Sequence, residues 1–142
     1  MSIWFKVPDL EQVNSWGDNT MLEHLGIAIT EIGEDYIEAT MPADHRTFQP
    51  FKLVHGGANV VLAESLGSIG AQLTVDPAKF YCVGQEVNAN HLRSVRKGSV
   101  RGRAMQVYRG KASQVWEIKL YDDREKLTCI SRLTMAVLKV TK

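Results

Sequence analysis

One acidic side chain lies where the sequence pattern predicts an apolar helix. Glu64 falls within residues 57–75, in which Leu62 and Leu66 follow helical spacing. A carboxylate buried in such a helix without a partner is costly, so Glu64 needs an explanation. Ser68 lies one helical turn later on the same face. Either it bonds Glu64 in a purely structural pair, or it positions the carboxylate or an attacking water.

A set of candidate hydrogen-bond donors precedes this helix. The motif His55-Gly56-Gly57 places backbone N–H groups where they lack intrahelical acceptors and lie at the positive end of the helix dipole. Because glycine lets a ligand approach the backbone, the Gly56 N–H is suited to hold a carbonyl oxygen on which negative charge develops. Gln49 offers a side-chain amide to the same oxygen. Taken alone, each feature is also typical of an ordinary turn or surface residue.

The spacing of Gly56 and Glu64 predicts that the site is shared between chains. Eight positions of helix correspond to about 12 Å, so both residues of one chain cannot reach a single carbonyl group. Two chains can, if their helices lie antiparallel across a two-fold axis and the start of one helix approaches Glu64 of the other. We therefore predict a homodimer at least, with two composite sites, and expect a homotetramer built as a dimer of dimers.

The rest of the sequence predicts the elements that position these groups. Residues 9–25 are typical of short helical turns, with Asp9 and Asn19 as caps. Residues 42–56 form an irregular loop rich in polar groups, a kind of segment that often has a functional role. Strand-like segments are predicted at residues 27–29, 36–41, 80–94, 99–109, 113–122 and 127–139.

These elements predict an α+β chain with the architecture of the hotdog fold, an antiparallel sheet wrapped around one long central helix. Long adjacent strands joined by tight turns favour an antiparallel meander, and only residues 57–75 are long and apolar enough to fill its concave face. Gly67 and Gly70 lower the helix propensity of this segment, which favours a packing reason for them. With 142 residues, we expect one domain spanning 1–142.

Local motifs resemble those of the hotdog-fold acyl-CoA thioesterases of the 4-hydroxybenzoyl-CoA and phenylacetic-acid-pathway type. Together they cover nearly the whole chain, which makes the resemblance far more specific than any single motif. The matching segments are Glu38-Ala39-Thr40-Met41-Pro42, Arg46-Thr47-Phe48-Gln49-Pro50-Phe51, His55-Gly56-Gly57, Leu62-Ala63-Glu64-Ser65-Leu66-Gly67-Ser68, Val87-Asn88-Ala89-Asn90-His91-Leu92-Arg93 and Ser131-Arg132-Leu133-Thr134.

The resemblance implies hydrolysis of an acyl-CoA thioester, preferentially one with an aromatic acyl group. It implies that Glu64 is the nucleophile or the general base, and the sequence leaves both roles open. It also implies that the Gly56 N–H and Gln49 polarise the thioester carbonyl. His55 is expected to assist near that carbonyl, and Ser68 to orient the hydrolytic water.

Basic residues offer a place for the phosphates of CoA. Arg93, Arg96, Lys97, Arg101 and Arg103 fall within eleven positions, and Arg109 follows shortly. Arg101 and Arg103 fit a solvated strand face equally well. His91 and Arg93 match the family segment and are the better candidates. We assign substrate and CoA binding to Gly84, His91, Arg93, Ser94 and Arg109.

Composition argues against several other classes. The 17 basic and 16 acidic residues leave no excess charge to attract nucleic acid or a membrane surface. No apolar run is long enough to span a bilayer, and no secretory signal is recognisable, so we expect a cytoplasmic protein. Cys82 and Cys129 are predicted to be buried, reduced thiols. The 4 histidines lack ligand spacing, so neither a metal nor another cofactor is expected.

Two alternatives belong to other functional classes. A hotdog dehydratase or hydratase also pairs a histidine with a carboxylate on the central helix, but such enzymes usually show a His-Phe-Pro-Gly-like loop, which is absent here. A non-catalytic acyl-CoA binding protein would keep the groove without the chemistry. The intact set of Gln49, Gly56, Glu64 and Ser68 argues against it.

Overall fold

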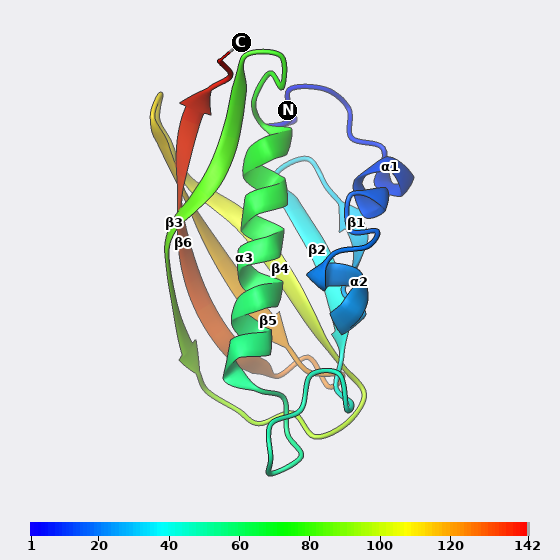
Figure 1. Ribbon diagram of the computed structural model, residues 1–142. Helices are drawn as coiled ribbons and strands as arrows, with labels where there is room; N and C mark the ends of the chain where they lie inside the picture. The colour runs from blue at the N-terminus through cyan, green and yellow to red at the C-terminus, as the bar shows by residue number, and fades with distance from the viewer. Residues whose placement is uncertain (142) are drawn as a thin grey trace.

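A curved sheet wraps around one long helix in the computed structural model, which describes residues 1–141 (Figure 1). Both short helices lie beside the strands at one edge of the sheet. In chain order the elements are α1 (Leu10–Ser15), α2 (Met21–Leu25), β1 (Ala28–Ile32), β2 (Tyr36–Pro42), α3 (Gly56–Leu73), β3 (Phe80–His91), β4 (Ser99–Arg109), β5 (Ser113–Tyr121) and β6 (Leu127–Lys139). The order of elements and the long central helix are confirmed.

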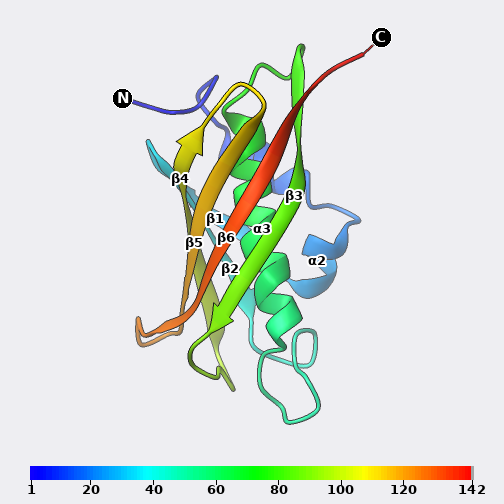
Figure 2. The ribbon, with the colours of Figure 1, turned by 90° about the vertical axis from the view of Figure 1, so that its left-hand side faces the viewer.

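The sheet has six antiparallel strands in the order β1-β2-β4-β5-β6-β3. The predicted meander is confirmed for β4, β5 and β6 but is wrong for β3, which pairs with β6 at the far edge (Figure 2). Residues 92–98 are not a tight turn. They pass below the start of α3, where the Val54 N–H donates to the Val95 carbonyl at 2.9 Å, and so carry the chain to the opposite side of the sheet.

Small residues let α3 approach the sheet closely. A Cβ at Gly67 would lie 2.5 Å from Leu133 Cδ2, and one at Gly70 would lie 2.9 Å from the Trp116 ring. Leu133 and Trp116 are fully buried, so neither can move away at low cost. The packing reason predicted for these two glycines is therefore confirmed.

The N-terminal segment corrects one predicted cap. Asp9 caps α1 as expected, because its carboxylate accepts from the Gln12 N–H at 3.2 Å. Asn19 does not cap α2. Thr20 takes that role by accepting from the Leu22 N–H, whereas Asn19 has a φ of 60° and donates its N–H to Glu23. The threonine hydroxyl sits closer in sequence to the first free N–H groups of α2, which is why it wins.

Both cysteines are free thiols. Cys129 is buried as predicted, and desolvation raises the pKa of its thiol to about 11. Cys82 is only half-buried, on the edge strand, and burial raises the pKa of its thiol as well. Raised pKa values disfavour the nucleophilic thiolate, so a catalytic cysteine finds no support.

Candidate active site

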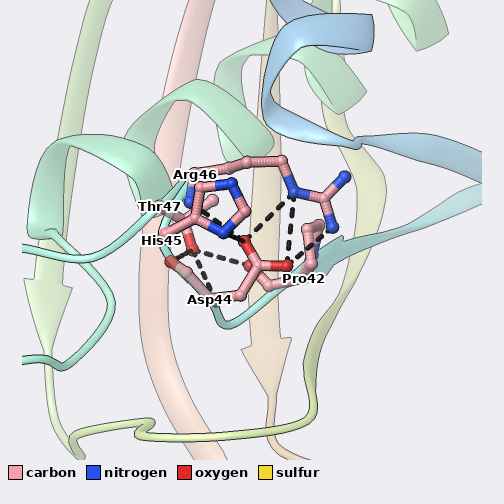
Figure 3. A network of polar contacts seen from close by, with 5 residues as sticks. All are labelled: Pro42, Asp44, His45, Arg46 and Thr47. Atoms are coloured by element: carbon pink, nitrogen blue, oxygen red, sulfur yellow. Dashed lines mark hydrogen bonds and ion pairs between the residues drawn. The ribbon is translucent and has the colours of Figure 1, made fainter.

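The loop before α3 is held by its own polar groups. The Asp44 carboxylate accepts from Arg46, with Nη2 at 2.7 Å, and the Arg46 guanidinium lowers the pKa of that carboxyl to about 2 (Figure 3). The Thr47 hydroxyl donates to the Pro42 carbonyl at 2.6 Å, which ties the loop to the end of β2. An isolated antiparallel bridge joins Phe48 to Val54. Residues 48–54 of the loop thus double back as a small hairpin that leads into the start of α3.

Gln49 lies inside this hairpin with its amide oriented. Its side-chain oxygen accepts from the Phe51 N–H, and its backbone N–H donates to the Leu53 carbonyl at 2.9 Å. With the oxygen engaged, the amide NH₂ group remains available as a donor. Lys52 takes a φ of 64°, which closes the tip of the hairpin.

The first turn of α3 presents one free backbone donor. His55 is the N-cap, and its Nδ1 accepts from the Gly57 N–H at 2.8 Å. Within residues 1–141 no acceptor bonds the Gly56 N–H. This N–H therefore lies at the positive end of an 18-residue helix with its hydrogen unused. His55 is exposed, and its accepting Nδ1 leaves the proton of the neutral ring on Nε2.

A cavity of about 340 Å³ opens beside this turn. Five of the residues predicted from sequence line it together: Gln49, Gly56, His91, Arg93 and Ser94. They come from the hairpin, the start of α3, the end of β3 and the connection that follows β3, segments that lie side by side at the lower end of the sheet in Figure 1. Asn59 lines the same cavity and was not predicted. Its signal was a polar side chain one turn after Gly56 in an apolar helix.

Glu64 lies in the middle of α3 and faces the edge strand β3. A Cβ at Gly84 would collide with Glu64 Oε2, so the carboxylate occupies the space that the glycine leaves. Glu64 is half-buried and has no hydrogen bond or ion pair within residues 1–141. A β-bulge follows directly, between Gly84 and Glu86, and such irregularities are common beside active sites.

Ser68 does not bond Glu64. Its hydroxyl points to the Met135 sulfur at 3.6 Å, a weak acceptor. The structural pair that would have given Glu64 a purely local explanation is therefore absent from the described residues. A hydroxyl with so weak a partner stays available to bind water.

Arg109 lies at the other end of α3 from the cavity. Its guanidinium donates to the Thr74 carbonyl at 2.5 Å and to the Ile3 carbonyl at 3.2 Å. Thr74 is the C-cap of α3, so one chain does not bring Arg109 to the Gln49 cavity. Its assignment to CoA binding stays a prediction.

Arg101 and Arg103 are engaged elsewhere. Both donate to the buried Glu38 carboxylate, at 2.9 and 2.5 Å, and they lie over the rings of Tyr121 and Tyr36. Hydrogen bonding to Glu38 raises the pKa of Arg103 further. These two arginines stabilise a strand face. Arg93 lines the cavity, and Arg96 and Lys97 are exposed on the connection that follows it in the chain.

Two kinds of feature are absent from residues 1–141. No cluster of three or more histidine, cysteine, aspartate or glutamate side chains has a geometry that could hold a metal ion. None of the helices in this range is both long and apolar enough to cross a membrane.

Comparison with known proteins assigns the family. The family model described as the thioesterase superfamily matches residues 51–129, more than half of the chain. The chain therefore belongs to the thioesterase superfamily. With it come the hotdog fold and the class of reaction: the protein is an enzyme that hydrolyses thioesters.

Close relatives extend over almost the entire sequence. The 1,4-dihydroxy-2-naphthoyl-CoA hydrolase of Escherichia coli is 48% identical over 136 residues, covering 96% of this chain and 99% of that protein. The proofreading thioesterase EntH of Cronobacter sakazakii is 47% identical, covering 96% and 98%. The Q49A variant of a thioesterase from Pseudomonas aeruginosa shares 49% identity with a TM-score of 0.97, covering 98% of this chain and all (100%) of that one.

Proposed function

We propose that the protein hydrolyses aromatic acyl-CoA thioesters to the free acid and CoA, with Glu64 as the catalytic carboxylate. One observation carries the proposal. The Glu64 carboxylate is half-buried and occupies the space left by the missing side chain of Gly84 in β3. It has no hydrogen-bond or ion-pair partner within residues 1–141. A carboxylate that no protein group engages is free to act on a substrate or a water placed beside it.

The donors at the start of α3 supply the complementary half of the chemistry. Attack on a thioester carbonyl places negative charge on its oxygen, and the Gly56 N–H together with the Gln49 amide is suited to hold that charge. If Glu64 acts as a general base, it takes a proton from water and the resulting hydroxide adds to the carbonyl carbon. If it acts as a nucleophile, an acyl-glutamyl anhydride forms and water opens it. In both routes the C–S bond breaks and CoA leaves as the thiol after protonation.

The two halves are proposed to come from different subunits. Gly56 and Glu64 are separated by eight residues of regular α3, about 12 Å. The 12-residue edge strand β3 pairs with no strand other than β6 within residues 1–141, although its Cys82 N–H donates to Gln72 Oε1 at 3.0 Å. A second copy pairing along that edge would bring two α3 helices together across a two-fold axis. Pairing of such dimers into a tetramer is part of the same proposal.

The substrate class rests on the relatives and on the cavity. One relative is named for hydrolysis of 1,4-dihydroxy-2-naphthoyl-CoA, an aromatic acyl-CoA. Arg93 lines the cavity, and Arg96 and Lys97 follow it in the chain as exposed cations; such side chains suit the phosphates of CoA, which bind charge-assisted donors. Substrates of the 1,4-dihydroxy-2-naphthoyl-CoA or benzoyl-CoA type follow from this combination.

The test is thiol release from a panel of aromatic and aliphatic acyl-CoAs by the parent protein, Glu64→Ala and Glu64→Gln. We expect the parent to favour aromatic substrates and both variants to lose roughly a thousandfold or more in kcat, the scale of removing a chemical group. Glu23→Gln, at an exposed position on α2, is the matched control and should keep parental rates. Parental rates in Glu64→Gln would end the assignment of this carboxylate, and faster release from aliphatic substrates would end the aromatic preference.

A further inference from the structure

Asn59 is a buried amide with a single partner. It lies in the second turn of α3 with 6% of its surface exposed. Its Nδ2 lies 3.5 Å from His91 Nδ1, and its Oδ1 has no partner within residues 1–141. An amide oxygen buried in this way costs stability, and an apolar residue of similar size would pack without that cost. The contact with His91 is what the amide at this position provides.

The other side of the His91 ring touches the start of α3. A Cβ at Gly56 would lie 2.9 Å from His91 Nε2 and 3.2 Å from Cε1, so the ring edge rests directly over the glycine. Asn59, His91, Gly56 and Gln49 all line the cavity of about 340 Å³. One ring nitrogen therefore faces Asn59, and the other lies over Gly56 in the lining of the cavity.

The direction of the hydrogen bond with Asn59 is linked to which ring nitrogen of His91 holds the proton. An amide NH₂ that donates to Nδ1 requires a lone pair there, so the neutral ring then has its hydrogen on Nε2. Hydrogen bonds of catalytic groups are often long without substrate and shorten in the complex, which accommodates the 3.5 Å separation. We propose that Asn59 is a positioning residue that holds His91 with its Nε2–H directed at the thioester carbonyl beside Gly56.

This inference rests on the proposed function and adds a third donor to the two already assigned. His91 would contact the reacting oxygen, whereas Asn59 acts only through His91. A purely structural role for Asn59 predicts a different pattern of losses, because it would not depend on the imidazole.

A double-mutant cycle separates the two roles. We expect Asn59→Leu to lower kcat about tenfold with KM changed less than about threefold, the scale of one lost hydrogen bond. In a His91→Ala background, the same substitution should change kcat less than about twofold. Equal losses in both backgrounds, or no loss in the parent, would overturn the inference. Asn59→Ala repeats the cycle if the leucine variant does not fold.

A spectroscopic readout tests the proton position directly. Two-bond ¹H–¹⁵N spectra of the parent should show the Nε2–H tautomer for His91, identified by the signals that vanish in His91→Ala. The Nδ1–H tautomer would contradict the proposal. Asn14→Leu is the matched control, since Asn14 makes two bonds of 2.8 Å to the Ile29 backbone and should lower the melting temperature without changing kcat.

Glu64→Ala is measured in the same series, so that two failures stay distinct. If Glu64→Ala is inactive and Asn59→Leu matches the parent, only the role of Asn59 falls. If Glu64→Ala keeps parental activity, the proposed function itself falls.

Discussion

The first turn of α3 and its middle differ in how their polar groups are satisfied. At the first turn, the N–H groups of His55, Gly57, Ala58 and Asn59 all have acceptors, whereas the Gly56 N–H and the Gln49 amide NH₂ have none within residues 1–141. At the middle, Glu64 and Ser68 have almost no partners of their own. We call Gln49 and Gly56 the donor region, because they present free N–H groups. We call Glu64 and Ser68 the acceptor region, because the Glu64 carboxylate accepts no bond and faces the edge strand β3. We propose that each region is half of an active site whose other half lies on another chain.

The largest effect is expected when two inactive variants are tested for their ability to restore each other. Gly56→Pro removes the free donor and leaves Glu64 intact, whereas Glu64→Ala does the reverse. When equal amounts are refolded together, half of the dimers are mixed and each mixed dimer has one complete site. We expect about a quarter of parental activity from the mixture, measured as thiol release, where either variant alone is nearly inactive.

The outcome that contradicts this picture is a mixture as inactive as its components, because a site built within one chain gains nothing from mixing. Glu64→Ala refolded with Glu64→Gln provides the baseline, since no pairing of these two chains restores a carboxylate.

Two substitutions at position 56 test the role of the free N–H in the donor region. Proline at position 56 removes the N–H yet suits the first residue of a helix, and His55 already has the extended φ of −63° and ψ of 134° that proline requires before it. We expect Gly56→Pro to lower kcat by about 10²- to 10³-fold, the effect of losing one oxyanion donor. Gly56→Ala adds a Cβ against His91 but keeps the N–H, so it should lose much less. Equal losses in stopped-flow thiol release from both variants would assign the effect to crowding instead.

A substitution at Gly84 tests whether Glu64 reacts from its position beside β3. A Cβ there would collide with Glu64 Oε2, so Gly84→Ala should turn the carboxylate away from β3. We expect kcat to fall about tenfold, because displacement of a reacting group by about 1 Å costs up to a hundredfold in rate. The melting temperature should change little, since Gly84 lies on an exposed edge. If kcat matches that of the parent, the space beside β3 is not where Glu64 reacts.

Much of this architecture follows from the sequence, because periodicity reports burial directly. The strands from Ser99 to Lys139 end within one residue of their predicted bounds, since Gly and charged residues mark each turn. The position of β3 in the sheet did not follow. Strand order depends on where a connection crosses, and residues 92–98 contain nothing that distinguishes a crossing from a turn.

Sequence predicts some residues of the candidate site and not others. Gln49, Gly56 and His91 were predicted from motifs, and the fold brings them to one cavity. Sequence alone does not identify Asn59, because a single polar residue in a helix gives no indication of which residues it contacts in the fold. Sequence distance places Arg109 among the other cations. Its contacts with Thr74 and Ile3 are tertiary, so they cannot be predicted from that distance. Sequence therefore identifies the chemistry that a residue offers more readily than the partners it meets.

The smallest effect is expected in the loop that supports the donor region. Asp44 has a folded-state pKa of about 2, below its ordinary 3.8, mainly because Arg46 bonds it. Its stabilising contribution is therefore fully present above pH 3.8 and is lost as pH falls through about 2. In Asp44→Asn we expect a slightly lower melting temperature near pH 6, and a gap to the parent that closes toward pH 2, with kcat reduced less than about threefold.

Asp18→Asn, which removes a surface carboxylate outside the ion pairs of residues 1–141, should show no such gap in the same calorimetric series. A gap that widens in acid would mean that the Asp44–Arg46 contact does not stabilise the hairpin, and that the donor region is held by Thr47 and the Phe48–Val54 bridge alone.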